Sequence, residues 1–323
     1  MNIRPRRNRK SEGVRSLVQE NWVTANDLLF PLFLLPGVNK KEDIKSMPGI
    51  SRFSLDLLLK EIEQCMNLGL RAFAVFPCLP EALKDKYATE SANKEGLYIK
   101  SLEKIKQEFP ESVIMTDVAM DPYSSDGHDG LVENGKILND ETLDILIKMS
   151  LAQAETGADM IGPSDMMDGR VGAIREALDA NGFTETSIIS YTAKYASAFY
   201  GPFRDALDSA PKFGDKKTYQ MNPANSKEAL LEADLDIEEG ADIIMVKPGL
   251  PYLDIIKSLK DNYTTPIAAY NVSGEYAMVK AAAEKGWLDN DKAIAETLLS
   301  FKRAGTDIIL TYFAKEAVMK KLV

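Results

Sequence analysis

Cysteine and histidine are scarce in this sequence of 323 residues, which has two cysteines, Cys65 and Cys78, and one histidine, His128. Two cysteines cannot form a disulfide framework, and Cys65 lies in an apolar helical pattern that is typical of a buried thiol. A single histidine argues against a histidine-rich zinc site and against any mechanism that needs two imidazoles. The scarcity of cysteine fits a protein of the reducing cytoplasm.

Basic charge is also in short supply, because 49 acidic residues outnumber 39 lysines and arginines and give a net charge of -10. Nucleic acid is therefore not an expected partner, since its binding needs cations that neutralise phosphates. No apolar run reaches membrane-spanning length and no glycine-rich phosphate loop is present, so neither a membrane partner nor an organic cofactor is expected. The one basic cluster lies at the N-terminus, lacks the apolar stretch of a secretory signal, and consists of Arg4, Arg6, Arg7, Arg9, Lys10 and Arg15.

Short apolar runs rich in β-branched and aromatic residues recur along the chain, each followed by a stretch with helical periodicity. This alternation is typical of βα units. Eight such units predict a closed (β/α)8 TIM barrel, for which this length is ordinary. The expected strands cover residues 28–35, 72–76, 113–118, 158–161, 187–191, 242–247, 266–271 and 307–313.

One local pattern, Gly157-Ala158-Asp159, recurs at 240–242 and, with threonine in the middle, at 305–307, each time leading into an expected strand. Its glycine is expected to be a left-handed helix cap. The repetition favours a barrel, although doubly wound sheets use the same joint. The expected helices cover residues 54–66, 140–155, 226–239, 273–284 and 291–303. Residues 1–20 lack clear periodicity and predict an extended arm that packs on a neighbouring subunit, and residues 21–323 predict the catalytic barrel.

Two lysines stand at the ends of neighbouring expected strands, where barrel enzymes place their active sites. Lys247 closes the sixth strand after four apolar residues, and Lys194 follows just beyond the fifth. Two close ammonium groups in a partly apolar site lower each other's pKa, which produces a free amine able to attack a carbonyl. Taken singly, a lysine at a strand end is more often solvated or paired with an acidic residue.

The loop after the third strand, residues 117–130, contains Asp117, Asp121, Asp126 and Asp129 with His128. Such a loop binds a cation or transfers protons, and its oxygen ligands suit Mg²⁺ better than zinc. An acidic, turn-forming surface loop explains the same composition equally well.

A long segment after the fifth strand supplies further cations and aromatic residues, among them Tyr200, Arg204 and Lys216. Arg204 and Lys216 are candidates for holding a substrate carboxylate. A long segment without regular structure is typical of an active-site lid.

Over nearly its whole length the sequence resembles the porphobilinogen synthase (5-aminolevulinate dehydratase) family. Residues 240–252, GADIIMVKPGLPY, resemble the family's segment around its Schiff-base lysine, and 191–196, YTAKYA, resemble its second lysine segment. Residues 163–170, 199–205 and 272–276 match as well. The resemblance implies condensation of two 5-aminolevulinate molecules to porphobilinogen, with loss of two waters, in tetrapyrrole synthesis.

The resemblance also implies roles for single residues. Lys247 would bind the substrate that gives the propionate side of the product and Lys194 the one that gives the acetate side, both as imines. Asp117, Asp121 and Asp129 would shape the second substrate's site. The implied substrate-binding residues are Ser273 and Tyr312 for the first carboxylate, Arg204, Lys216 and Gln220 for the second, and Tyr200 beside them.

Zinc-dependent members of the family carry cysteines where this chain has Ala119, Asp121 and Asp129. The resemblance therefore implies the cysteine-free, magnesium-responsive branch, with no catalytic zinc. Glu232 matches the family's ligand for allosteric Mg²⁺ at a subunit boundary, although a glutamate on a surface helix reads the same. A homo-octamer embraced by the N-terminal arms is implied too.

Two other functions stay open at this point. A class I aldolase-like barrel lyase also needs a lysine at a strand end, but one lysine suffices there. A non-catalytic, ring-forming scaffold would use the arm and the acidic surface for assembly, and would have no need for both lysines together with the carboxylate-binding set.

Overall fold

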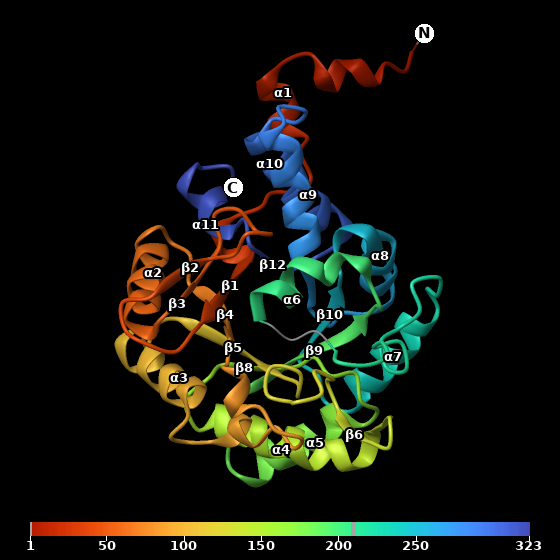
Figure 1. The fold of residues 1–323 in the computed structure, drawn as a ribbon. Coiled ribbons are helices and arrows are strands. Elements are labelled where there is room, and N and C mark those ends of the chain that lie inside the picture. Colours follow the sequence, from red (N-terminus) through yellow and green to blue (C-terminus); the bar gives the residue numbers. More distant parts are fainter. Residues whose placement is uncertain (1, 208–210) are drawn as a thin grey trace.

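The computed structural model describes residues 2–207 and 211–323. Eight parallel strands follow one another around a closed sheet, and the last strand pairs with the first through Leu28 with Ile309 and Leu29 with Leu310. The predicted (β/α)8 barrel is therefore confirmed (Figure 1). Its strands are β1 (Leu28–Leu34), β4 (Ala72–Pro77), β5 (Val113–Val118), β8 (Met160–Pro163), β9 (Ser187–Lys194), β10 (Ile243–Lys247), β11 (Ile267–Asn271) and β12 (Ile308–Thr311).

The strands are apolar along nearly their whole length because helices cover the outside of the barrel and side chains fill its inside. Every residue of β1, β10 and β11 is buried. The outer helices are α2 (Leu55–Asn67), α3 (Leu97–Glu108), α4 (Asn139–Ala154), α5 (Arg170–Ala180), α7 (Glu228–Glu238), α8 (Leu253–Asn262), α9 (Ser273–Glu284), α10 (Asn290–Ala304) and α11 (Ala314–Met319). Four of them, α3, α5, α8 and α11, are not among the helices that we expected from the sequence.

The repeated joints behave as predicted at their glycines, which have positive φ values of 85°, 103° and 113° at Gly157, Gly240 and Gly305. The aspartate two positions later has a role that the sequence did not reveal. Asp159 accepts a hydrogen bond of 2.7 Å from the backbone N–H of Ile114, at the start of the preceding strand. The same bond recurs from Ile188 to Asp242 and from Ile267 to Asp307.

Several segments around the mouth of the barrel differ from the expectation. The first part of the region after β9 is not irregular, since it forms a 3-10 helix, η5 (Ala198–Tyr200), and α6 (Gly201–Leu207), whereas residues 211–227 contain no helix or strand. Pro202 lies in the first turn of α6, where proline is tolerated. Two short hairpins are also present, β2 (Lys41–Asp43) with β3 (Ser51–Phe53), which joins the barrel sheet at β1, and β6 (Leu131–Glu133) with β7 (Lys136–Leu138), which form a separate two-stranded sheet.

The N-terminal segment projects away from the barrel (Figure 1). It is partly helical, with η1 (Pro5–Arg9) and α1 (Glu12–Leu17), and neither element has a buried residue. Its packing against another subunit remains a prediction. Among the described residues, no helix combines the length and the apolar character needed to cross a bilayer.

Candidate active site

Lys247 and Lys194 lie side by side at the carboxyl ends of two neighbouring strands. They are register partners in the pairing of β10 with β9, and their exposed fractions are 7% and 6%. Lys194 is the last residue of β9, so our expectation that it lies beyond the strand was wrong. The two amines therefore emerge at one level of the barrel mouth.

Lys247 is surrounded by aromatic rings. Its Nζ lies 4.8 Å from the ring centre of Tyr270, 5.0 Å from those of Tyr191 and Phe203, and 5.4 Å from that of Tyr200. Within the described part of the chain, the amine has no hydrogen bond and no ion pair. Burial, reinforced by the charge of nearby Lys194, lowers the pKa of Lys247 to about 7. A large fraction of this amine is therefore unprotonated at neutral pH.

Lys194 has ionic surroundings instead. Its Nζ lies 3.0 Å from Oδ2 of Asp129 and also donates to the backbone carbonyl of Ser164. The other carboxylate oxygen of Asp129 accepts from Nζ of Lys216 at 2.6 Å, and Lys216 further reaches Asp121 at 3.2 Å. Two ammonium groups and two carboxylates thus form one buried network.

The two carboxylates of this network and the nearby Asp117 differ in their pKa values. Burial acts against ionisation of Asp129, but Lys194 and Lys216 outweigh it and hold the pKa of Asp129 well below its usual range. Burial, together with the charge of Asp121, raises the pKa of Asp117 to about 6. Burial also raises the pKa of Asp121, against the opposing effect of Lys216. Asp117, at the end of β5, is therefore the carboxyl best suited to exchange protons near neutral pH.

The aspartate loop is not a surface loop, because no residue from 117 to 130 is exposed. His128 and Tyr219 hold it against the segment 211–221: the imidazole Nδ1 lies 3.1 Å from Tyr219 Oη, and its Nε2 lies 3.0 Å from the carbonyl of Phe213. Since that carbonyl only accepts, Nε2 of the neutral ring carries the proton, and Nδ1 accepts from the phenol. We had expected the loop of His128 to bind a cation or transfer protons, and the contact of its imidazole with Tyr219 was not predicted.

The ammonium of Lys216 lies against both Asp121 and Asp129. It therefore competes with any metal ion that these two carboxylates would bind. Across residues 2–207 and 211–323, no group of three or more histidine, cysteine or acidic side chains is arranged to hold a metal ion. Ala119 stands where zinc-dependent members of the family carry one of their three cysteines. It is buried and offers no ligand. The charges that a cation would balance are balanced here by lysines.

Three of the predicted substrate-binding residues lie on the Lys247 side. Ser273, the first residue of α9, accepts a hydrogen bond of 2.9 Å from the backbone N–H of Phe203. Tyr312 follows β12, and its hydroxyl lies 2.9 Å from that of Tyr270. Tyr200 donates instead to the backbone, with its hydroxyl 2.7 Å from the carbonyl of Tyr195 and 3.1 Å from that of Lys247. Tyr200 therefore supports the lysine as well as the cage around it.

The other three come from two different elements. Arg204 lies on α6, is partly exposed and has no ion pair with the described residues. Lys216 and Gln220 are buried on the segment 211–221, and the Gln220 backbone N–H donates to the carbonyl of Lys216 at 2.9 Å. Of these three residues, Lys216 is the one that forms ion pairs with Asp121 and Asp129.

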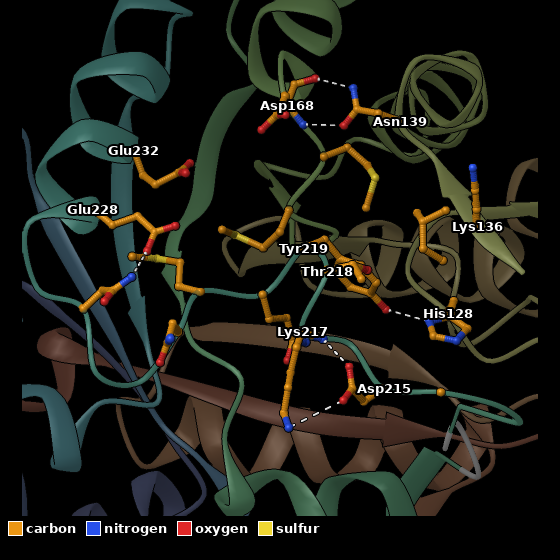
Figure 2. A pocket seen from close by; sticks show the side chains of 18 of the residues that line it. His128, Lys136, Asn139, Asp168, Asp215, Lys217, Thr218, Tyr219, Glu228 and Glu232 are labelled. Carbon is orange, nitrogen blue, oxygen red and sulfur yellow. Dashed lines mark hydrogen bonds and ion pairs between the residues drawn. The ribbon is translucent and has the colours of Figure 1, made fainter.

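Glu232 lies in a separate place, on α7 in the wall of a cavity of about 870 Å³ that Gln220 and Met221 also line. Figure 2 shows Glu232 and Glu228 projecting from one side and Asp168 lying across from them. Asn139 bonds only to the backbone of Asp168, and Asn225 donates to the carboxylate of Glu228, whereas the carboxylate of Glu232 has no hydrogen bond or ion pair within the described chain. Burial raises the pKa of Glu232 to about 7.

Several residues that complete the site were not predicted. Ser164, Phe203 and Tyr270 contact one of the two lysines, directly or by their rings. Tyr270 lies near the end of β11 and Ser164 directly follows β8, so their places at strand ends were the available signal. Phe203 comes from a helix that we had interpreted as irregular, and its place in the segment 199–205, which resembles the family, was the available signal.

Known proteins share both the sequence and the fold. The profile of the delta-aminolevulinic acid dehydratase family matches residues 2–320. A delta-aminolevulinic acid dehydratase of Bradyrhizobium diazoefficiens is 55% identical over 98% of this chain and 90% of its own length, and a chloroplastic one of Physcomitrium patens is 54% identical over 98% and 74%. The crystal structure of the enzyme (porphobilinogen synthase) from Toxoplasma gondii, in complex with its reaction product porphobilinogen, superposes with a TM-score of 0.98 at 53% identity, over 99% of this chain and 92% of that one. This chain is thus an enzyme that belongs to the delta-aminolevulinic acid dehydratase family.

Proposed function

We propose that this enzyme condenses two molecules of 5-aminolevulinate to porphobilinogen, with loss of two waters, through imines on Lys247 and Lys194. The observation that carries the proposal is the pair of buried lysines in register on β9 and β10, one caged by aromatic rings and the other ion-paired. A single-lysine aldolase has no use for the second amine. The product complex of the Toxoplasma gondii relative is consistent with this reaction.

Lys247 is the amine ready to attack. With a pKa of about 7 it is substantially uncharged at neutral pH, and it adds to the ketone carbon of the first substrate. Loss of the former ketone oxygen as water gives an imine. When this imine is protonated, the surrounding ring faces stabilise its positive charge.

Lys194 must first give up a proton, since its ammonium is bound to Asp129 and to the carbonyl of Ser164. Asp117, with a pKa of about 6, is the nearby group able to take and return protons. The second ketone then reacts as the first did. One carbon–carbon and one carbon–nitrogen bond form between the substrates, both ketone oxygens leave as water, and both lysines are released.

The substrate carboxylates need separate partners. Ser273 and Tyr312, near Tyr270 and Phe203 of the Lys247 cage, suit the first. Arg204, Lys216 and Gln220 suit the second, because they bring two cations and an amide to the Lys194 side of the mouth. Lys216 would then exchange part of its contact with the aspartates for the substrate.

We further propose the magnesium-responsive, zinc-free type of enzyme, with Mg²⁺ held by Glu232. The carboxylate fits such a role because it is partly buried, lines a cavity and has no partner within the described residues. Mg²⁺ needs only one or two protein carboxylates and keeps several waters. A bound cation would favour the ionised form of Glu232. The cavity that holds it is not lined by Lys247 or Lys194. The homo-octamer joined by N-terminal arms and the cytoplasmic location belong to this proposal, supported by the projecting arm.

Borohydride reduction in the presence of 5-aminolevulinate tests the chemistry directly. Mass spectrometry of peptides should find adducts at Lys247 and at Lys194, and none at the exposed Lys217, and the unreduced reaction should give a product that reacts with Ehrlich's reagent. Adducts with a sugar phosphate and none with 5-aminolevulinate would indicate an aldolase. Absence of both adducts and product would favour the scaffold.

A further inference from the structure

Strand β9 contains one extra residue shortly before Lys194, at positions 191–192. Ile244 of β10 pairs with Ser190 and Val246 pairs with Ala193, so Tyr191 and Thr192 together stand against the single residue Met245. This arrangement is a β-bulge, a feature that redirects side chains next to active sites.

The bulge decides on which side of the barrel Lys194 lies. Side chains alternate between the two faces of a strand, so residues an even number apart share a face. Ser190 faces the helices, where its hydroxyl donates to Asp236 of α7 at 2.6 Å. If the alternation continued unbroken through Tyr191 and Thr192, Lys194, four residues after Ser190, would face the helices too. With the bulge, Lys194 turns into the mouth and reaches Asp129 and Ser164.

Arg170, the first residue of α5, contacts the bulge from outside the barrel. Its Nη2 donates to the carbonyl of Tyr191 at 3.4 Å and to the hydroxyl of Ser190 at 3.2 Å. Its Nη1 donates to the carbonyl of Met167 at 3.3 Å and to Asp236 at 3.4 Å. The planar guanidinium therefore spans the bulge, α7 and the loop before α5 in one geometry, which a lysine cannot reproduce.

The surroundings of Arg170 are unusually charged for a buried layer. Arg170 is 2% exposed, as is Asp236, and Asp165, with Oδ2 at 3.8 Å from the guanidinium Nε, is fully buried. Buried charges are costly and contribute little net stability compared with apolar packing. Stability alone therefore does not explain these buried charges, whereas a role in holding the adjacent bulge does.

We propose that Arg170 is a positioning residue for Lys194, acting through the β9 bulge that turns this lysine into the active site. The inference builds on the proposed function, since it concerns the lysine that would form the second imine. Arg170 contacts no substrate in this account. Its effect passes through the backbone of Tyr191 to Lys194, and Lys247 on the next strand keeps its position.

The variants Arg170→Lys and Arg170→Gln test this, with Arg175→Gln as the matched control. Arg175 lies on the same helix and also binds backbone carbonyls, those of Thr186 and Phe183, but it does not contact the bulge. In both Arg170 variants we expect borohydride trapping at Lys194 to fall about tenfold relative to trapping at Lys247. Amide hydrogen exchange should become faster in residues 190–196 and stay unchanged in 243–247.

Unchanged trapping and exchange in a folded Arg170 variant would overturn the proposal, as would equal losses in Arg175→Gln. If neither single variant folds, the double variant Arg170→Met/Asp236→Leu replaces them, because it removes both buried charges at once. Failure of the proposed function is recognised separately, by the absence of adducts in the unmodified enzyme. Hydrogen exchange then still decides on Arg170, since it needs no substrate.

Discussion

Lys247 and Lys194 are the same residue type at the same level of adjacent strands, yet their surroundings are opposite. Aromatic rings enclose the first, which has no ion pair within the described residues, and a carboxylate and a carbonyl bind the second. An apolar enclosure disfavours the ammonium form, whereas a carboxylate stabilises it. Position in the fold therefore brings both amines to the barrel mouth, and in the proposed mechanism their neighbours decide which one reacts first.

Removal of the lysines gives the largest expected effect on this comparison. Lys247→Ala should lower the rate of product formation by about four orders of magnitude or more, because the free amine is lost. Lys194→Ala should also abolish the product, but it should leave borohydride trapping of 5-aminolevulinate at Lys247 intact. Lys217→Ala, at an exposed lysine, should change neither. Strong trapping at Lys194 in the Lys247→Ala enzyme would break the proposed order.

Loss of the shared carboxylate should have the next largest effect. Asp129→Asn removes the charge that binds both Lys194 and Lys216 while keeping the shape, so we expect kcat to fall about 100-fold. Trapping at Lys247 should change less than about twofold, since Asp129 is only a minor influence on that amine. Asp215→Asn, at an exposed carboxylate that pairs with Lys217, is the control. A parallel loss of trapping at both lysines would show one common environment.

The aromatic cage gives a prediction about pH. Lys247 reacts as the free amine, so kcat/KM should rise with pH through about 7. Phe203→Gln admits water and weakens the effect of burial, which raises the pKa of Lys247 and moves this limb to higher pH. About fivefold less activity at pH 7 is expected for a shift of one pH unit, because the free fraction of an amine with a pKa of about 7 falls from about one half to about one eleventh. Phe53→Gln, at a ring that lies near Lys41 instead, should leave the limb in place. A limb that moves to lower pH would contradict the role of burial.

Glu232 should have the smallest effect, because it lies outside both lysine environments. Glu232→Gln should remove the stimulation by Mg²⁺, about a few-fold, and leave the basal rate unchanged. Glu238→Gln, at an exposed position of the same helix, should keep the stimulation. A zinc-selective chelator should leave the activity nearly intact. Strong inhibition by such a chelator would contradict the zinc-free assignment.

Periodicity was enough to predict the barrel, because buried parallel strands and helix-capping glycines leave local patterns. The place of Lys247 followed from the apolar run before it. Lys194 was misplaced because a bulge depends on the pairing of two strands, and no pattern within residues 187–194 announces it. The cage was invisible for a similar reason, since Tyr191, Phe203 and Tyr270 are brought together only by the closed fold. Helix α6 was not predicted because its first two residues, Gly201 and Pro202, are of types that usually favour loops.

The aspartates of the repeated joints lie at the opposite end of the barrel from the lysines. Each one ties the start of its own strand to the start of the preceding strand, as Asp159, Asp242 and Asp307 do. These aspartates thus join neighbouring strands at the base of the barrel, whereas the two lysines and their neighbours lie at its mouth. Substitutions at the mouth can accumulate while these hydrogen bonds keep the strands joined at the base. The mouth can therefore change in evolution without loss of the barrel fold.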